Sequence, residues 1–193
     1  MKLILATDNE GKTVEMQHAL SHLPLEVITL NDYPQIGDIP ETGNTLVENA
    51  FIKAEKVFKE TGIPALADDT GLEIDVLNGA PGVYSARYAG ERATFEENCS
   101  KVLDELSEVA PEKRTARFRT VITFVDKNQE LSTEGHIDGV ISESIKGDGG
   151  FGYGQVVGRQ ATDLGIEKAR SLGRAWVGSR NNHHLGRIGA YAE

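Results

Sequence analysis

The 193-residue sequence predicts one α/β domain in which strands and helices mix without a strict βαβ repeat. Three observations predict this class. A short apolar strand leads directly into a helix at the amino terminus, two more helical stripes follow, and two long strands come in succession in the second half. The length suffices for one buried core and is compatible with two lobes.

Two strands and two helices are expected in the first third. Residues 2–7 predict a short buried strand and residues 26–30 a second strand, and a loop with two prolines follows the second strand. Helices are expected at residues 11–23 and 45–59. Their helical spacing is carried by Met16, Ala19, Leu20 and Leu23 in the first and by Leu46, Ala50, Ala54 and Val57 in the second.

The remaining elements are a strand, a helix and a strand pair. Residues 65–76 predict a strand and turn that carry an acidic pair. Thr94 and Glu97 have the spacing of a capping box, and a helix of about three to four turns should follow it. Residues 114–125 and 131–141 predict paired antiparallel strands. Because Cys99 is the single cysteine, an internal disulfide is excluded. Its position on the predicted helix favours a structural role.

Composition excludes several classes of protein. A net charge of −10 argues against non-specific binding to nucleic acid, which depends on clustered Lys and Arg. It does not exclude a nucleotide, which needs only a few cations and a metal in a cleft. No apolar run approaches the roughly 20 residues that span a membrane, and the apolar start is too short for a signal peptide. We therefore expect a cytoplasmic protein that binds neither membrane nor nucleic acid.

The first polar segment is Thr7-Asp8-Asn9-Glu10-Gly11-Lys12, between a predicted strand and a predicted helix. Backbone N–H groups at a helix start, a glycine for close approach and a lysine for charge together suit a phosphate group. The segment lacks the glycine spacing of a Walker A loop. By itself it also fits an ordinary turn capped by Asp8 or Asn9.

Two acidic segments follow. Glu41 lies in the loop before the second helix, and Glu48, Asn49 and Lys53 lie on neighbouring faces of that helix, where each by itself also fits a solvated surface. The segment at residues 67–72 holds two adjacent carboxylates, which repel each other unless a cation lies between them. Magnesium binds a few carboxylates together with waters and phosphate oxygens. The alternative is a turn capped by Asp68.

Together these segments resemble the inosine triphosphate pyrophosphatase family, whose members remove deaminated purine nucleoside triphosphates. Order and spacing agree over about the first four-fifths of the chain. The matching motifs are Thr7-x-Asn9-x-x-Lys12, Glu41-Thr42-Gly43-x-Thr45-x-x-Glu48-Asn49-Ala50-x-x-Lys53-Ala54, Ala67-Asp68-Asp69-Thr70-Gly71-Leu72, the run from Gly79 to Gly90, and Gly149-Gly150-Phe151-Gly152-Tyr153. The resemblance implies an elongated two-lobed α/β fold with a long mixed sheet, a central substrate cleft and a homodimer.

The resemblance also implies roles for individual residues. Magnesium (Mg2+) would bind Glu41 and Asp69, with Asp68 as a further candidate ligand, and Asp69 would be the catalytic residue that activates water. Phe151 would stack on the base, whereas Arg87 is a phosphate candidate on grounds of charge. The implied substrate-binding set is Thr7, Asp8, Asn9, Glu10, Gly11, Lys12, Lys53, Thr70, Arg87, Phe151, Gly152, Tyr153 and Lys168.

The implied reaction is hydrolysis between the α and β phosphates of a purine nucleoside triphosphate, which gives the monophosphate and pyrophosphate. Phosphoryl chemistry needs positioning and charge neutralisation more than covalent help, and the acidic and basic residues are suited to both. Two alternatives stay open: a Maf-like pyrophosphatase that acts on other modified nucleotides, and a nucleotide-binding protein with impaired turnover.

Residues 154–193 depart from the family pattern. Gly154 stands where the family has an aspartate that helps to recognise the base, and no Ser-His-Arg follows Glu167-Lys168. This part also carries more cations than anions, unlike the strongly acidic part before it. It is either a divergent tail whose basic residues still reach the phosphates or, as a second hypothesis, a product of a shifted reading frame. Resequencing of the gene tests the second hypothesis, because a confirmed unbroken frame would exclude it.

Overall fold

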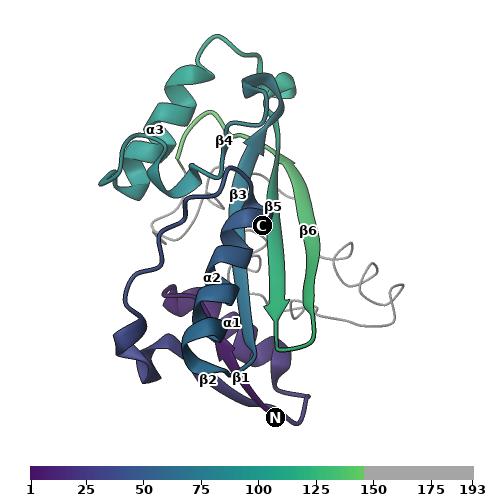
Figure 1. Ribbon diagram of the computed structural model, residues 1–193. Coiled ribbons are helices and arrows are strands. Elements are labelled where there is room, and N and C mark those ends of the chain that lie inside the picture. The colour runs from purple at the N-terminus through teal and green to yellow at the C-terminus, as the bar shows by residue number, and fades with distance from the viewer. Residues whose placement is uncertain (146–193) are drawn as a thin grey trace.

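The computed structural model describes residues 1–145, and these form a six-stranded mixed sheet with helices on both faces (Figure 1). The strands follow the order β2-β1-β3-β5-β6, and β4 pairs with β3 beyond the end of β1. The strands are β1 (Lys2–Leu5), β2 (Glu26–Thr29), β3 (Ala65–Ile74), β4 (Pro81–Gly82), β5 (Thr115–Val125) and β6 (Glu130–Val140), and the helices are α1 (Glu10–Leu20), α2 (Leu46–Thr61) and α3 (Phe95–Glu105).

The sheet is mixed, and the two-residue β4 is antiparallel to β3 on the edge that β3 shares with β1. β1 runs parallel to both β2 and β3, whereas β5 is antiparallel to β3 and to β6. Every residue of β3 pairs with β5, from Ala65 opposite Val125 to Ile74 opposite Ala116. β3 is therefore the central strand that joins the amino-terminal strands to the long antiparallel pair.

Apolar side chains divide by face as the alternation of a strand requires. On one face, Leu66 packs with α1, and further along the same face Leu72 and Ile74 pack with α3. On the opposite face, Ala65 and Ala67 pack with α2. Since α1 and α3 cover the two ends of one face, the β3 positions between them are left for polar residues.

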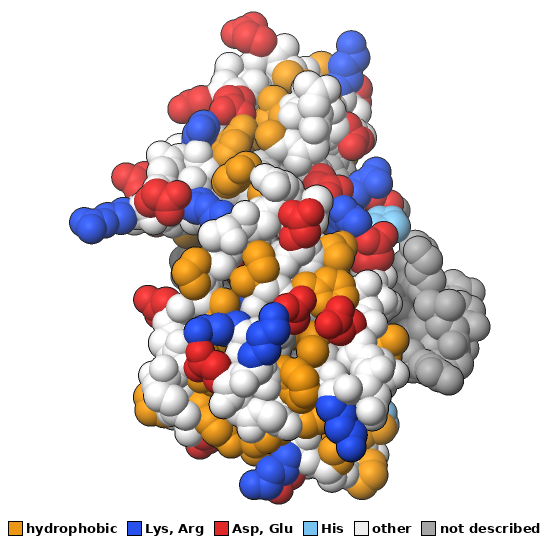
Figure 2. All heavy atoms as spheres, in the orientation of Figure 1, with side chains coloured by type: hydrophobic (Ala, Val, Ile, Leu, Met, Phe, Trp, Pro, Cys, Tyr) orange, Lys and Arg blue, Asp and Glu red, His pale blue; other side chains and the backbone are white. Residues whose placement is uncertain are grey.

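Helix ends agree with local capping chemistry. Thr45 Oγ1 accepts the Glu48 N–H at 3.1 Å at the start of α2, and Gly62 ends this helix with a φ of 67°. Thr94 and Glu97 form the capping box expected at the start of α3. The exposed side of α2 carries ion pairs one helical turn apart, Lys56 with Glu60 and Lys59 with Glu55. Figure 2 shows Lys and Arg side chains interspersed with Asp and Glu over the viewed face.

The predicted elements are confirmed, with differences at their ends. α1 runs from Glu10 to Leu20, so Leu23 lies beyond it, although it still packs against the α1 core. The acidic pair lies inside a continuous strand and not at a turn, because β5 pairs with β3 throughout. The two-residue strand β4 was not predicted. Cys99 is fully buried, and burial raises the pKa of its thiol to about 12, as suits a structural residue.

One edge of β3 is interrupted. The pairing with β1 ends at Leu66, and the pairing with β4 begins at Leu72. The segment between these points, residues 67–71, is the acidic segment singled out from the sequence. Helices that span a membrane are not found among residues 1–145, where no helix is both long enough and apolar enough.

We predict that Gly71→Ala destabilises the fold. A Cβ at Gly71 would lie 2.5 Å from the carbonyl oxygen of Gly82 and 3.2 Å from Leu46 Cδ2, so β4 would have to move away. Overpacking of this kind costs about 1–3 kcal/mol, measured as the free energy of unfolding in urea.

Gly135→Ala in β6 is the matched control for Gly71→Ala. None of the described atoms lies within 4 Å of a Cβ built there, and alanine is favoured over glycine in a strand interior. Equal stabilities of the two variants would contradict the close packing of β4 on Gly71.

Candidate active site

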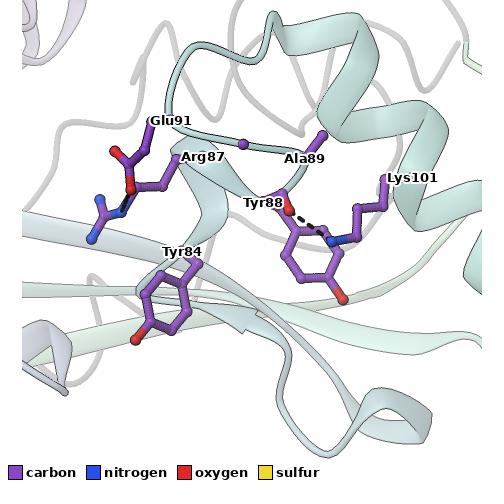
Figure 3. Close-up of a pocket in the computed structure, with 7 residues that line it drawn as sticks. Tyr84, Arg87, Tyr88, Ala89, Glu91 and Lys101 are labelled. Carbon is purple, nitrogen blue, oxygen red and sulfur yellow. Dashed lines mark hydrogen bonds and ion pairs between the residues drawn. The ribbon is translucent and has the colours of Figure 1, made fainter.

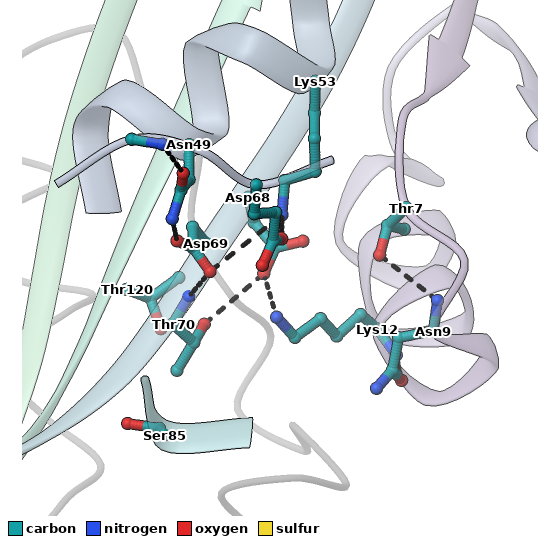
Figure 4. A network of polar contacts seen from close by, with 12 residues as sticks. Thr7, Asn9, Lys12, Asn49, Lys53, Asp68, Asp69, Thr70, Ser85 and Thr120 are labelled. Carbon is teal, nitrogen blue, oxygen red and sulfur yellow. Dashed lines mark hydrogen bonds and ion pairs between the residues drawn. The ribbon is translucent and has the colours of Figure 1, made fainter. Parts of the chain in front are cut away.

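Asp68 and Asp69 mark the centre of a buried polar network at the interrupted edge of β3 (Figure 4). They are only 2% and 7% exposed. Consecutive strand residues point to opposite faces, so Asp68 faces the side that carries α1, and Asp69 faces α2. Each carboxylate therefore has its own set of partners.

Asp68 forms an ion pair with the amino-terminal turn of α1. Lys12 Nζ lies 2.7 Å from Asp68 Oδ2, and the Thr70 hydroxyl donates to the same oxygen at 3.4 Å. Burial would lower the pKa of Lys12, but the negative charge and hydrogen bond of Asp68 outweigh it, with smaller contributions from Asp69 and Glu41. The pKa of Lys12 is therefore raised, and the buried ammonium stays charged.

The same turn of α1 is organised by local hydrogen bonds. Asn9 caps the helix, with its Oδ1 accepting the Lys12 N–H at 3.0 Å, and the Asn9 N–H donates to Thr7 Oγ1 at 3.4 Å. These bonds place Lys12 in the first turn, directly after the buried strand β1. A helix start with a charged lysine in its first turn is an arrangement that favours an anion.

Asp69 accepts two hydrogen bonds and has a lysine nearby. The Thr70 N–H donates to Oδ1 at 2.9 Å, Asn49 Nδ2 donates to Oδ2 at 3.1 Å, and Lys53 Nζ lies 4.0 Å from Oδ1. Burial nevertheless raises the pKa of the Asp69 carboxyl, and the charge of Glu41 adds to this rise. Asp69 is therefore a stronger base than an ordinary aspartate.

Glu41 completes the cluster from the loop before α2. Lys53 Nζ lies 2.6 Å from Glu41 Oε1, so this ammonium is in contact with Glu41 and near Asp69. Arg87 reaches Glu41 from the η4 turn (Ser85–Arg87), with Nη1 3.8 Å from Oε2 and Nη2 donating to the backbone oxygen at 3.4 Å. Glu41 and Asp69, which come from two separate elements, thus share Lys53 as a cation.

The donor set fits a hydrated magnesium ion better than a closed metal site. Among residues 1–145, no three His, Cys, Asp or Glu side chains lie close enough together to hold a metal. Magnesium needs only one or two carboxylates when water and phosphate oxygens complete its shell. Glu41 and Asp69 already share a cation, Lys53. Asp68 Oδ1 is also buried without a hydrogen-bond partner in the described structure, so it could accept a further donor or ligand.

The network contains two polar residues that the sequence did not single out as site residues. Asn49 is fully buried and contacts Asp69 directly. Thr120 lies opposite Thr70 in the strand register, with their hydroxyl oxygens 2.9 Å apart. The sequence placed Asn49 on a helix face next to that of Lys53 but assigned it no role in the site. Thr120 had no comparable signal, since its position depends on strand pairing.

The structure thus gathers most of the predicted site residues at one place. The residues in the contacts above are Thr7, Asn9, Lys12, Glu41, Lys53, Asp68, Asp69, Thr70 and Arg87. Asp8 and Glu10 are exposed on either side of Asn9, and Gly11 lies in the first turn of α1. Phe151, Gly152, Tyr153 and Lys168 lie outside the described residues.

A surface pocket of about 430 Å³ lies beside Arg87 (Figure 3). Two tyrosines and two cations line it: Arg87 lies over the Tyr84 ring at 5.4 Å, and Lys101 over the Tyr88 ring at 4.2 Å. Arg87 therefore belongs both to this pocket and to the partners of Glu41.

Comparison with known proteins gives a consistent result. The model of the Ham1 family matches residues 3–163, so residues 164–193 lie outside the match. A dITP/XTP pyrophosphatase of Photobacterium profundum is 45% identical over 158 residues, which cover 80% of each chain. That of Xanthomonas axonopodis pv. citri is 48% identical over 158 residues, which cover 80% of this chain and 79% of the relative. A solved HAM1 protein from Coxiella burnetii has a TM-score of 0.77 and 36% identity, with 99% of this chain and 98% of that chain covered.

We predict that Asp69→Asn raises the free energy of unfolding of the metal-free protein near neutral pH. The folded protein binds the Asp69 proton more tightly than the unfolded chain does, so the charged carboxylate costs stability. This cost in stability is full above the folded-state pKa of Asp69. It disappears as the pH falls to 3.8, the ordinary pKa of an aspartate.

Urea unfolding of both proteins with a chelator, between about pH 7 and about pH 4, measures this difference. The stability gain of the variant should shrink as the pH falls. A variant that is less stable than the parent near neutral pH would contradict the prediction.

Proposed function

Since the chain belongs to the Ham1 family, we propose that it hydrolyses deaminated purine nucleoside triphosphates such as dITP, ITP and XTP to the monophosphate and pyrophosphate, and so clears them from the nucleotide pool. One observation carries this proposal. Hydrolysis of a triphosphate needs cations for the phosphates and a carboxylate for a metal. Lys12, Lys53 and Asp69 supply these groups in one network at the interrupted edge of β3.

The start of α1 supports the binding of the triphosphate. Lys12 is charged and mostly buried, and it lies in the first turn of α1, where helix N–H groups favour an anion. In the free protein Asp68 neutralises Lys12 at 2.7 Å. A polyphosphate would supply several further acceptors for the three N–H donors of Lys12, so it can bind without removing this ion pair.

We propose that magnesium is held by Glu41 and Asp69. When bound, the ion neutralises phosphate charge and favours attack at phosphorus. Lys53, which pairs with Glu41 in the free protein, then has a phosphate oxygen as an alternative partner. Asp68 as a third ligand stays a prediction, supported by its buried and unpartnered Oδ1.

Asp69 suits the role of the base that takes a proton from the attacking water. Its pKa is raised mainly by burial, which increases its proton affinity, and its side chain is fixed by hydrogen bonds from Thr70 and Asn49. Attack at the α-phosphorus breaks the bond to the β-phosphate bridging oxygen. The water oxygen stays on the monophosphate, and pyrophosphate leaves.

Recognition of the base is proposed on the sequence resemblance alone. Phe151, Gly152 and Tyr153 are expected to contact the purine, and Gly154 replaces the aspartate of the family pattern. We propose that selectivity among purines is reduced in this chain, because a hydrogen-bonding side chain is missing. The homodimer and the cytoplasmic location are likewise proposals that follow from the resemblance.

Asp69→Asn should lower kcat for pyrophosphate release from ITP by about 10²–10⁴-fold, the range that a lost general base accounts for. The same change at Asp104, an exposed aspartate on α3, is the control and should leave kcat unchanged. If Asp69→Asn retained most of the parent rate, Asp69 would have no part in proton transfer.

A panel of triphosphates tests the substrate class. We expect pyrophosphate release from the triphosphates of inosine and xanthosine to exceed that from those of guanosine and adenosine, and to stop when magnesium is removed. Faster release from pyrimidine or methylated nucleotides would favour a Maf-like enzyme instead. Tight binding of ITP without pyrophosphate release would show a nucleotide-binding protein that has lost turnover.

A further inference from the structure

Asn49 links Asp69 of the proposed magnesium site to the loop that carries Glu41. Its side chain is fully buried in α2 and makes two hydrogen bonds in opposite directions. Oδ1 accepts the N–H of Gly43 at 2.7 Å, and Nδ2 donates to Asp69 Oδ2 at 3.1 Å. One amide therefore links the loop before α2 with the central strand β3.

The loop that Asn49 holds is the one that carries Glu41. A Cβ at Gly43 would lie 2.8 Å from Asn49 Oδ1 and 2.6 Å from Glu48 Cβ, so this close contact requires glycine. The next N–H, of Asn44, donates to Glu48 Oε2 at 2.6 Å. Residues 43 and 44 are thus anchored to α2 only two and three residues after Glu41.

We propose that Asn49 is a positioning residue that sets the separation and orientation of Glu41 and Asp69. The inference rests on the proposed magnesium site. Because the Gly43 N–H must bond to the amide oxygen, the amide NH₂ is directed to Asp69, and neither an apolar nor a carboxylate side chain can make both bonds. Side chains that hold metal ligands in place affect metal affinity by about 10–100-fold.

α3 provides a matched control in Asn98. This residue is also buried, its Oδ1 accepts the Ala89 N–H at 2.7 Å, and its Nδ2 donates to the Ala86 backbone oxygen at 3.1 Å. Each of the two asparagines thus accepts a backbone N–H at 2.7 Å and donates to an oxygen at 3.1 Å. Only Asn49 bonds to a carboxylate of the proposed metal site.

The test measures metal binding by the purified full-length chain without substrate. Mn²⁺ serves as the probe, and its dissociation constant is measured by electron paramagnetic resonance of the free ion for the parent, Asn49→Leu, Asn98→Leu and Asp69→Asn. We expect Asn49→Leu to raise the dissociation constant at least about 10-fold. Asn98→Leu should lower the melting temperature by about as much as Asn49→Leu does, but it should leave Mn²⁺ binding unchanged.

The outcomes separate the two proposals. If Mn²⁺ binding by the parent does not depend on Asp69, the metal site is wrong and the role of Asn49 is overturned with it. If binding depends on Asp69 but is equal in the parent and Asn49→Leu, only the role of Asn49 is overturned. Should Asn49→Leu fail to fold, Gly43→Ala gives the answer, because it keeps the amide but pushes it from its position. Parent-like Mn²⁺ affinity of Gly43→Ala would then overturn the proposal.

Discussion

The burial of two consecutive carboxylates in the central strand is the constraint on which the rest of the site depends. A buried carboxylate is costly unless a cation and hydrogen bonds compensate it. Since neighbouring residues in a strand point to opposite faces, a single cation cannot form a close ion pair with both carboxylates. The fold supplies Lys12 from α1 to Asp68 and Lys53 from α2 to Asp69, so the helices on the two faces of β3 each bring one lysine to the same edge.

This arrangement also explains why the site lies where the sheet is interrupted. On this edge of β3 the pairing with β1 ends before Asp68, and the pairing with β4 begins after Gly71. No described strand therefore pairs with this edge along the acidic segment. The start of α1 and the Glu41 loop approach there instead. Compensation for Asp69 is incomplete, as its raised pKa shows, so a further cation beside it would be favourable. This incomplete compensation supports the proposed magnesium site.

Much of the fold and part of the site could be predicted from local sequence. The helices were predictable because Thr45 and Thr94 cap them and their apolar residues recur at helical spacing. β4 was not predictable, since two residues carry no periodicity and their pairing depends on the glycine contact at Gly71. A strand and turn were expected for residues 65–76, and local sequence did not specify, for a similar reason, that the strand continues through the acidic pair. Two aspartates are unfavourable in a strand by propensity, and only the pairing with β5 overrides this.

The sequence by itself determined which chemical groups are present and their order along the chain: a lysine at a helix start, a glutamate before a helix, and an aspartate pair after an apolar run. Those features depend only on residues that are close together in the sequence, so local sequence patterns predict them. The tertiary structure alone decided that Lys12 pairs with Asp68, that Lys53 lies between Glu41 and Asp69, and that Asn49 and Thr120 join the network. These contacts join residues far apart in the sequence, such as Lys12 with Asp68 and Thr70 with Thr120, and they follow from strand register and helix packing, which no local pattern specifies.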